Sequence, residues 1–200
     1  MTAPSLLRFA VGMTFVLTVG CFGPSVSPPN YSPTASADAA MSEYDSNKDG
    51  KIDQKELERS PALKNSLDDL DLDKDKAIGR DELVKRLTEF SNSKIALMNV
   101  GVRITRAGQP LANANVKFVP ESFHGAAIKP ASGKSDAQGS IEFRTEGSAL
   151  PGLAQGFYRV EVSVKDDAGQ ETIPATFNTN TTLGQQVRAN LRGSIEIKIP

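Results

Sequence analysis

The sequence predicts an α+β fold of two modules, a helical pair of acidic loops followed by an all-β sandwich of seven strands. Two acidic twelve-residue segments, 45–56 and 71–82, lie among short apolar patterns of helical spacing. Beyond residue 93 apolar residues alternate with polar ones, which is typical of half-buried strands. We therefore expect the helical module over residues 38–92 and the sandwich over residues 95–200.

The composition excludes several classes of function. The 200 residues carry 23 basic and 24 acidic side chains, so the net charge of −1 provides no global field for nucleic acid. One Cys and one His exclude disulfides, Cys/His zinc sites and most pairs of nucleophile and base. We expect no catalytic residues and no nucleic-acid partner, and any metal has to be bound by oxygen.

Residues 1–20 are typical of an export signal. A single cation, Arg8, precedes an apolar run over 9–19, which is too short to span a bilayer as a helix. The run ends in Leu17-Thr18-Val19-Gly20-Cys21, which resembles the bacterial lipobox although Thr18 replaces the usual aliphatic residue. This resemblance implies lipidation of Cys21 and an exported protein anchored to the membrane. A signal cut by the ordinary peptidase, or a buried N-terminal segment, is the alternative.

A spacer is expected after the anchor. Residues 21–37 are rich in Pro, Ser, Thr and Ala, a composition that favours extended chain and buries no core.

The first acidic segment, 45–56, resembles an EF-hand loop. Oxygen side chains stand at loop positions one, three and five, Gly50 turns the chain at position six, and position twelve is a glutamate that can give two oxygens. This resemblance implies a Ca²⁺ site, in which Lys51 acts through its carbonyl and Asp53 through water. The predicted ligands are Asp45, Asn47, Asp49, Lys51, Asp53 and Glu56.

The second segment, 71–82, repeats the pattern with two changes. Lys76 stands where glycine is usual, so a bulky residue must adopt a left-handed conformation, and Gly79 brings no side chain to position nine. We expect this loop to bind Ca²⁺ more weakly. The predicted ligands are Asp71, Asp73, Asp75, Ala77 through its carbonyl, and Glu82. The alternatives are a solvated acidic face, and a metal that only holds the fold together.

The segment between the loops fits a compact pair. Ile52 and Ile78 occupy position eight of their loops, where they can form a short strand pair, and Pro61 is expected to begin a new helix. Loop starts only 26 residues apart are similar to the compact EF-hand pairs of exported bacterial proteins.

Alternation and turn chemistry predict the strands of the second module. Sequences such as Asp136-Ala137-Gln138-Gly139 favour tight reversals between them. The predicted strands are 99–106, 116–119, 140–144, 157–164 and 194–199, with 187–191 as a weaker candidate.

Three segments carry a family resemblance: 108–116, 135–143 and 156–162. They resemble the transthyretin-like carboxypeptidase-regulatory family, which implies a prealbumin-like sandwich over residues 97–199 that serves as a non-catalytic accessory module. Together with the lipobox and the acidic loops, the chain is similar to small lipoproteins of planctomycete-type bacteria.

A hydrolase is a poor alternative. One transthyretin-related group hydrolyses 5-hydroxyisourate and ends in Tyr-Arg-Gly-Ser, whereas this chain has Leu191-Arg192-Gly193-Ser194. His124 cannot supply the several histidines of such a site, and we expect it to be solvated in a long loop.

The charge is unevenly divided between the modules. Residues 41–90 carry 14 acidic and 10 basic residues, whereas residues 94–200 carry 9 and 12. This allows the modules to dock, although we expect independent modules on a tether at 91–93.

The expected function is that of a calcium-binding envelope lipoprotein whose sandwich binds an envelope protein or a polysaccharide. A purely structural envelope protein is the alternative.

Overall fold

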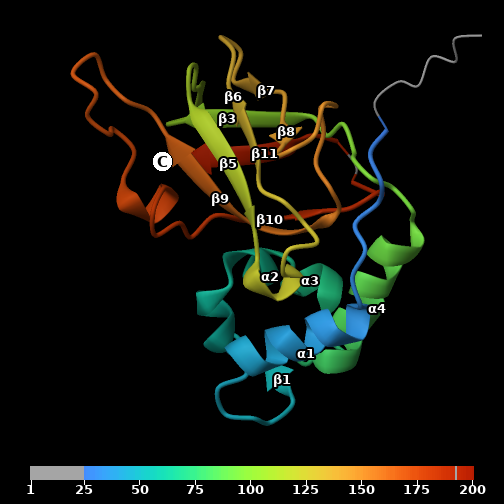
Figure 1. The fold of residues 1–200 in the computed structure, drawn as a ribbon. Coiled ribbons are helices and arrows are strands. Elements are labelled where there is room, and N and C mark those ends of the chain that lie inside the picture. Colours follow the sequence, from blue (N-terminus) through green and yellow to red (C-terminus); the bar gives the residue numbers. More distant parts are fainter. Residues whose placement is uncertain (1–24, 192) are drawn as a thin grey trace, which may run out of the picture.

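The computed structural model describes residues 25–191 and 193–200. The predicted signal, Cys21 and the start of the predicted spacer lie outside these described residues. The described chain has a mixed α+β fold, with helices gathered at one end and sheets at the other (Figure 1). Within that described part, none of the helices is both long enough and apolar enough to cross a membrane.

Serine and proline residues begin two of the helices in the N-terminal half. Ser32 Oγ accepts a hydrogen bond from the backbone N of Ala35 at 3.3 Å, and Ser60 Oγ accepts one from Leu63 N at 3.4 Å. A proline follows each serine at the first helical position, so the predicted helix start at Pro61 is confirmed. The elements of this half are α1 (Pro33–Tyr44), β1 (Lys51–Ile52), η1 (Glu56–Arg59), α2 (Pro61–Asn65), α3 (Leu67–Leu70), β2 (Ile78–Gly79) and α4 (Arg80–Asn92).

The prediction of an extended spacer through residue 37 is wrong at its end. Helix α1 begins at Pro33, and Ala37 is completely buried against the rest of the helical half. The sequence pattern misled because a proline in a Ser/Thr-rich stretch is typical of both a linker and the first turn of a helix.

The predicted pairing of the two loops is confirmed. Strands β1 and β2 are antiparallel, Ile52 lies opposite Ile78, and both side chains are fully buried. The pair therefore attaches both loops to one hydrophobic core, which includes Leu57, Leu83 and Leu87.

The C-terminal half contains two sheets. The larger has the strand order β10-β9-β5-β6-β8, and the smaller has the order β11-β3-β4 with β7 also paired to β3. Strand β11 runs parallel to β3, and the other pairs are antiparallel. The elements are β3 (Val102–Arg106), β4 (Gln109–Pro110), β5 (Asn115–Pro120), η2 (Ser122–His124), β6 (Ala131–Lys134), β7 (Ser140–Ile141), β8 (Arg144–Thr145), β9 (Gly156–Ser163), η3 (Ala175–Phe177), β10 (Gly184–Val187) and β11 (Ile195–Ile199).

The two sheets enclose a second hydrophobic core. Strand β9 turns Tyr158, Val160 and Val162 into it, and the smaller sheet contributes alternate residues such as Ile104 and Ile197. This alternation is the period-two pattern that identified the strands in the sequence.

Three strand predictions need correction. The predicted strand 140–144 is split, because β7 pairs with β3 in one sheet and β8 pairs with β6 in the other. The weak candidate 187–191 is displaced, since the strand there is β10 and ends at Val187. Strands β4 and β6 were not predicted, because β4 lies within the segment 107–110 that was read as a turn, and the β6 sequence Ala-Ser-Gly-Lys has no apolar alternation.

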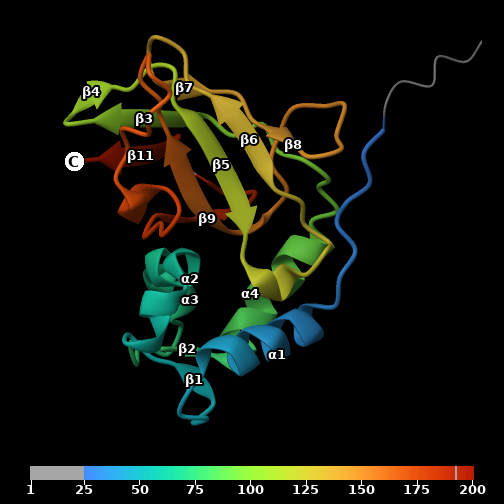
Figure 2. The same cartoon turned by 60° about the vertical axis from the view of Figure 1, so that its left-hand side comes forward.

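The expectation of independent modules is also wrong. Figure 2 shows the helices seated against one end of the sheets, and Phe123 and Phe157 from the β half belong to the hydrophobic core of the helical half. The ring of Phe157 lies 5.6 Å from that of Phe90 on α4, measured between centroids. The junction therefore includes a buried apolar contact, in addition to any attraction between the oppositely charged halves.

Candidate metal centre

Residues 45–56, called loop 1 from here on, connect α1 to η1. Asp45 directly follows α1, and its two carboxylate oxygens accept hydrogen bonds from the backbone N of Asp49 at 3.2 Å and of Gly50 at 3.0 Å. Gly50 has a φ of 89°, a left-handed conformation that glycine adopts without steric cost. The loop therefore folds back over the carboxylate of its first residue.

The last residue of loop 1 closes it from the other side. Glu56 Oε1 accepts hydrogen bonds from the backbone N of Ser46 at 2.7 Å and of Asn47 at 3.2 Å, while Oε2 accepts one from Asp53 N at 3.0 Å. The residue is only 7% exposed. Its carboxylate is thus fixed beside the start of the loop, where a position-twelve ligand is required.

Residues 71–82, called loop 2, repeat these hydrogen bonds position by position. The carboxylate at position one, Asp71, accepts from the backbone N at positions five and six, at 3.1 and 2.9 Å. The carboxylate at position twelve, Glu82, accepts from positions two, three and nine, at 2.6, 3.4 and 2.7 Å. In both loops position three accepts from position five, and position five accepts from position seven.

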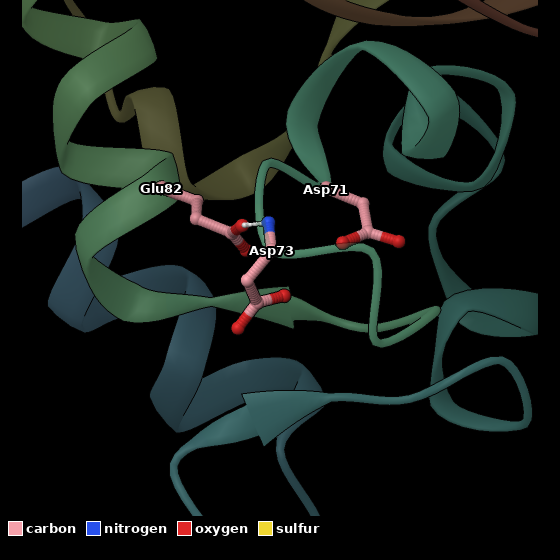
Figure 3. A group of neighbouring side chains, drawn as sticks. All are labelled: Asp71, Asp73 and Glu82. Carbon is pink, nitrogen blue, oxygen red and sulfur yellow. Dashed lines mark hydrogen bonds between the residues drawn. The ribbon is translucent and has the colours of Figure 1, made fainter.

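Three carboxylates of loop 2 converge. Asp71, Asp73 and Glu82 each place an oxygen within 4.8 Å of the others. Figure 3 shows Glu82 reaching from α4 towards the backbone nitrogen of Asp73, while Asp71 and Asp73 extend from the loop. In loop 1 position three is an asparagine, and Asn47 Nδ2 donates a hydrogen bond to Asp49 Oδ2 at 2.9 Å.

The left-handed conformation predicted for Lys76 is confirmed, with a φ of 68°. Position four is also left-handed in both loops, at Lys48 with 60° and Lys74 with 63°. Loop 2 therefore holds two non-glycine residues in a conformation that costs an L-residue about 1–2 kcal/mol.

A cation of loop 1 lies against loop 2. Lys51 Nζ donates a hydrogen bond to Asp75 Oδ2 and lies 3.7 Å from Asp73 Oδ2. The hydrogen bond to Asp75 raises the pKa of Lys51 and lowers the pKa of Asp75, and both groups are open to solvent. This contact was not predicted, because Lys51 was assigned only a carbonyl ligand.

The remaining predicted ligands fall at the ends of the short strand pair. Lys51 begins β1, Ala77 directly precedes β2, and Asp53 follows β1. Asp53 Oδ1 accepts hydrogen bonds from the backbone N of Lys55 and Glu56 at 2.8 and 2.9 Å. Asp53 therefore holds the turn that leads into η1, which is compatible with a ligand acting only through water.

The donor set fits a hard cation. Each loop directs carboxylate or amide oxygens from positions one, three, five and twelve, and the described residues place no sulfur or imidazole ligand among them. Calcium takes six to eight such oxygens in flexible geometry, whereas zinc prefers nitrogen and sulfur.

His124 is not the solvated residue that the sequence suggested. It is 2% exposed, its Nε2 accepts a hydrogen bond from Phe157 N at 3.0 Å, and its ring stacks on that of Phe157. Burial lowers the pKa of His124 from 6.5 to about 3. A neutral ring with one nitrogen already bonded is a packing residue of the junction.

The residues that join the loops to the β half were also missed. Glu121, which directly follows β5, is 2% exposed and accepts a hydrogen bond from Tyr44 OH at 3.1 Å. An isolated glutamate before Ser-Phe-His gives no sequence signal of this role.

Comparisons with models of protein families, with curated proteins and with solved structures found no match for this chain.

Proposed function

We propose that the protein binds calcium through a pair of EF-hands formed by loops 1 and 2. The observation that carries the proposal is the shared network of hydrogen bonds, in which position twelve accepts from positions two, three and nine in both loops. The two loops differ in sequence, and a solvated acidic face gives no reason for the same network to form twice. Bound calcium would neutralise the clustered carboxylates and so stabilise the folded chain.

The proposed ligands of loop 1 are Asp45, Asn47, Asp49, the carbonyl of Lys51, Asp53 through water, and Glu56. Those of loop 2 are Asp71, Asp73, Asp75, the carbonyl of Ala77, and Glu82. Affinities on the order of 10⁻⁴–10⁻³ M are expected, as for extracellular calcium modules.

We also propose that the protein is an exported lipoprotein. This proposal rests on the resemblance of residues 17–21 to a lipobox, and Cys21 lies outside the described residues. Labelling of the expressed chain with a radioactive fatty acid tests it: the unsubstituted protein should take up the label and Cys21→Ala should not.

The β half is proposed to be a prealbumin-like sandwich that binds an envelope protein or a polysaccharide without catalysis. Two sheets enclosing one core support this architecture. No role in binding nucleic acid is proposed.

A purely structural role for calcium is the second candidate. It is favoured by the buried junction, since Phe123 and Phe157 of the β half complete the hydrophobic core beneath the loops. In that case calcium raises the unfolding temperature of the whole chain but leaves binding of envelope material unchanged.

Calcium titration calorimetry on the purified full-length chain tests the proposal. The unsubstituted protein should show two sites, while Glu56→Gln and Glu82→Gln should each lose one, because each removes a carboxylate that gives two oxygens. Magnesium serves as the competing cation.

Two variants provide matched controls. Glu58→Gln changes an exposed carboxylate on the same turn as Glu56, and Glu89→Gln changes one on the same helix as Glu82. Both should keep two sites. Absence of heat, and of any rise in the unfolding temperature, at millimolar calcium would contradict the proposal.

A further inference from the structure

Glu121 connects the two halves of the chain. Its backbone is part of the β half, whereas its side-chain carboxylate contacts the helical half. Its backbone N donates a hydrogen bond to the carbonyl oxygen of Phe157 at 2.9 Å, which extends the pairing of β5 with β9 by one residue. The main chain is therefore held by the larger sheet, and the side chain points away from that sheet into the junction.

Three donors of the helical half surround this carboxylate. Oε1 accepts hydrogen bonds from Ser60 Oγ at 2.8 Å and from Ala62 N at 3.4 Å, and Oε2 accepts one from Tyr44 OH at 3.1 Å. Tyr44 and Ser60 are themselves buried. Removing a carboxylate from water is costly unless such partners replace the water, so the loss of any one of these donors weakens the contact.

These donors stand on either side of loop 1. Tyr44 is the last residue of α1 and directly precedes Asp45, while Ser60 directly follows η1, the turn that begins with Glu56. One side chain of the β half therefore connects the chain entering loop 1 with the chain leaving it. The first and last ligands of the proposed calcium site lie on the segment between these two contacts.

We infer that Glu121 is a positioning residue for the calcium site of loop 1, so that the β half sets the calcium affinity of this loop. The inference rests on the proposed function. Calcium binding requires Asp45 and Glu56 in one coordination shell, and a contact that fixes the flanking residues reduces the entropy lost when that shell forms. By linkage, calcium in loop 1 strengthens the junction by the same free energy.

Beyond the packing of Phe90 on Phe157, about two turns of α4 away from Glu82, the polar contact of the β half nearest to loop 2 is weaker than that of Glu121. Asp69, close before this loop, forms an ion pair with Arg188 at 2.9 Å, but the Asp69 side chain is 48% exposed. Exposed ion pairs contribute little to stability, whereas the Glu121 contact is buried. The effect of Glu121 should therefore be confined to loop 1, and this selectivity distinguishes positioning from a general loss of stability.

The test isolates each loop by calorimetry of the full-length chain. In a Glu82→Gln background only loop 1 binds calcium, and adding Glu121→Gln should weaken that binding by about tenfold. In a Glu56→Gln background only loop 2 binds, and Glu121→Gln should change its affinity by less than about twofold. Glu146→Gln, an exposed residue just after β8, is the matched control and should change neither.

Smaller substitutions keep the test decisive if Glu121→Gln does not fold. Tyr44→Phe removes only the hydroxyl before loop 1, and Ser60→Ala removes only the hydroxyl after η1. Each should weaken loop 1 by about threefold without affecting loop 2.

The outcomes separate the inference from the proposed function. If the unsubstituted chain binds no calcium, the proposed function fails and the inference fails with it. If it binds two calcium ions, and Glu121→Gln and Tyr44→Phe leave the affinity of loop 1 unchanged or weaken both loops equally, only the inference is overturned.

Discussion

The backbone of Gly184 in β10 lies directly against Pro61 at the start of α2. A Cβ atom at position 184 would be 2.0 Å from the carbonyl carbon of Pro61 and 2.2 Å from the backbone N of Ala62. These are backbone atoms, which no side-chain movement can clear. The edge of the larger sheet thus touches the helix that follows loop 1, and glycine is required there because of this contact and not because of its backbone angle.

Gly184→Ala should separate the two halves at this point. We expect the free energy of unfolding to fall by about 2–4 kcal/mol, because overpacking against fixed backbone forces a shift of the helix. Denaturant unfolding followed by circular dichroism measures the loss. Gly147→Ala is a useful comparison, since a Cβ there meets no atom within 4 Å although its φ of 77° is strained. A smaller loss for Gly184→Ala than for Gly147→Ala would contradict the close packing described here.

The conformation of Lys76 should limit the calcium affinity of loop 2. Lys76→Gly is expected to tighten binding by about five- to tenfold, because glycine relieves the left-handed strain and the substitution also removes a positive charge from the loop. Lys76→Gln removes the charge but keeps the strain, so its calcium affinity in loop 2 should lie between those of the unsubstituted protein and of Lys76→Gly. Calorimetry in a Glu56→Gln background, where loop 1 does not bind calcium, ranks the three affinities of loop 2. If Lys76→Gly and Lys76→Gln bind calcium equally well, the whole effect is due to charge.

Lys51 should compete with calcium in loop 2. Its ammonium group contacts Asp75 and lies near Asp73, two of the proposed ligands, and must move away when a divalent cation enters. We expect Lys51→Gln to raise the affinity of loop 2 severalfold at low salt and less at high salt, because the charges are exposed and screened. Lys55→Gln is the control, since it removes an equal charge from an exposed position of loop 1, the loop that also contains Lys51. If both variants have the same effect, general charge and not this contact is responsible.

The parts of the fold that could be predicted are those specified over short distances in the chain. The acidic loops follow from ligand spacing, and the pairing of Ile52 with Ile78 follows from their equivalent positions in the two loops. The alternation of apolar and polar residues likewise identified strand β9. In each case the pattern repeats within a single element, so a sequence window contains all the information.

The parts that could not be predicted depend on contacts between distant segments. Phe157 lies in a strand whose other apolar residues face the sheet core, and nothing local indicates that this one ring enters the helical core instead. Strand β6 lacks apolar alternation because a Cβ at Gly133 would lie 2.5 Å from the carbonyl oxygen of Glu142. Glu121 has a role only because α1 and η1 fold back onto it.

The buried His124 should make stability depend on pH in mildly acidic solution. Its pKa is about 3 when folded and 6.5 ordinarily, so between these values the unfolded chain binds a proton that the folded chain does not. Stability contributed by the neutral ring is therefore present above pH 6.5 and is lost as the pH falls towards 3, at up to about 1.4 kcal/mol for each pH unit.

Glu121 should act in the opposite direction. Burial raises the pKa of its carboxyl group, so the folded chain binds a proton more readily than the unfolded chain and stability is gained as the pH falls. The dependence on pH in the unsubstituted protein contains both contributions, together with those of carboxylates such as Asp75, whose pKa is lowered. A variant that removes only the histidine is needed to separate them.

His124→Gln supplies that variant, since the amide oxygen can accept the hydrogen bond from Phe157 N and does not titrate in this range. Urea unfolding between pH 5 and 7.5, with a calcium chelator present throughout, measures the slope of stability against pH. Because the chain contains one histidine, the difference in slope between the two proteins isolates this group. We expect the unsubstituted protein to lose stability more steeply below pH 6.5; parallel curves would mean that His124 is protonated equally in the folded and unfolded chains, which is incompatible with its burial in the junction.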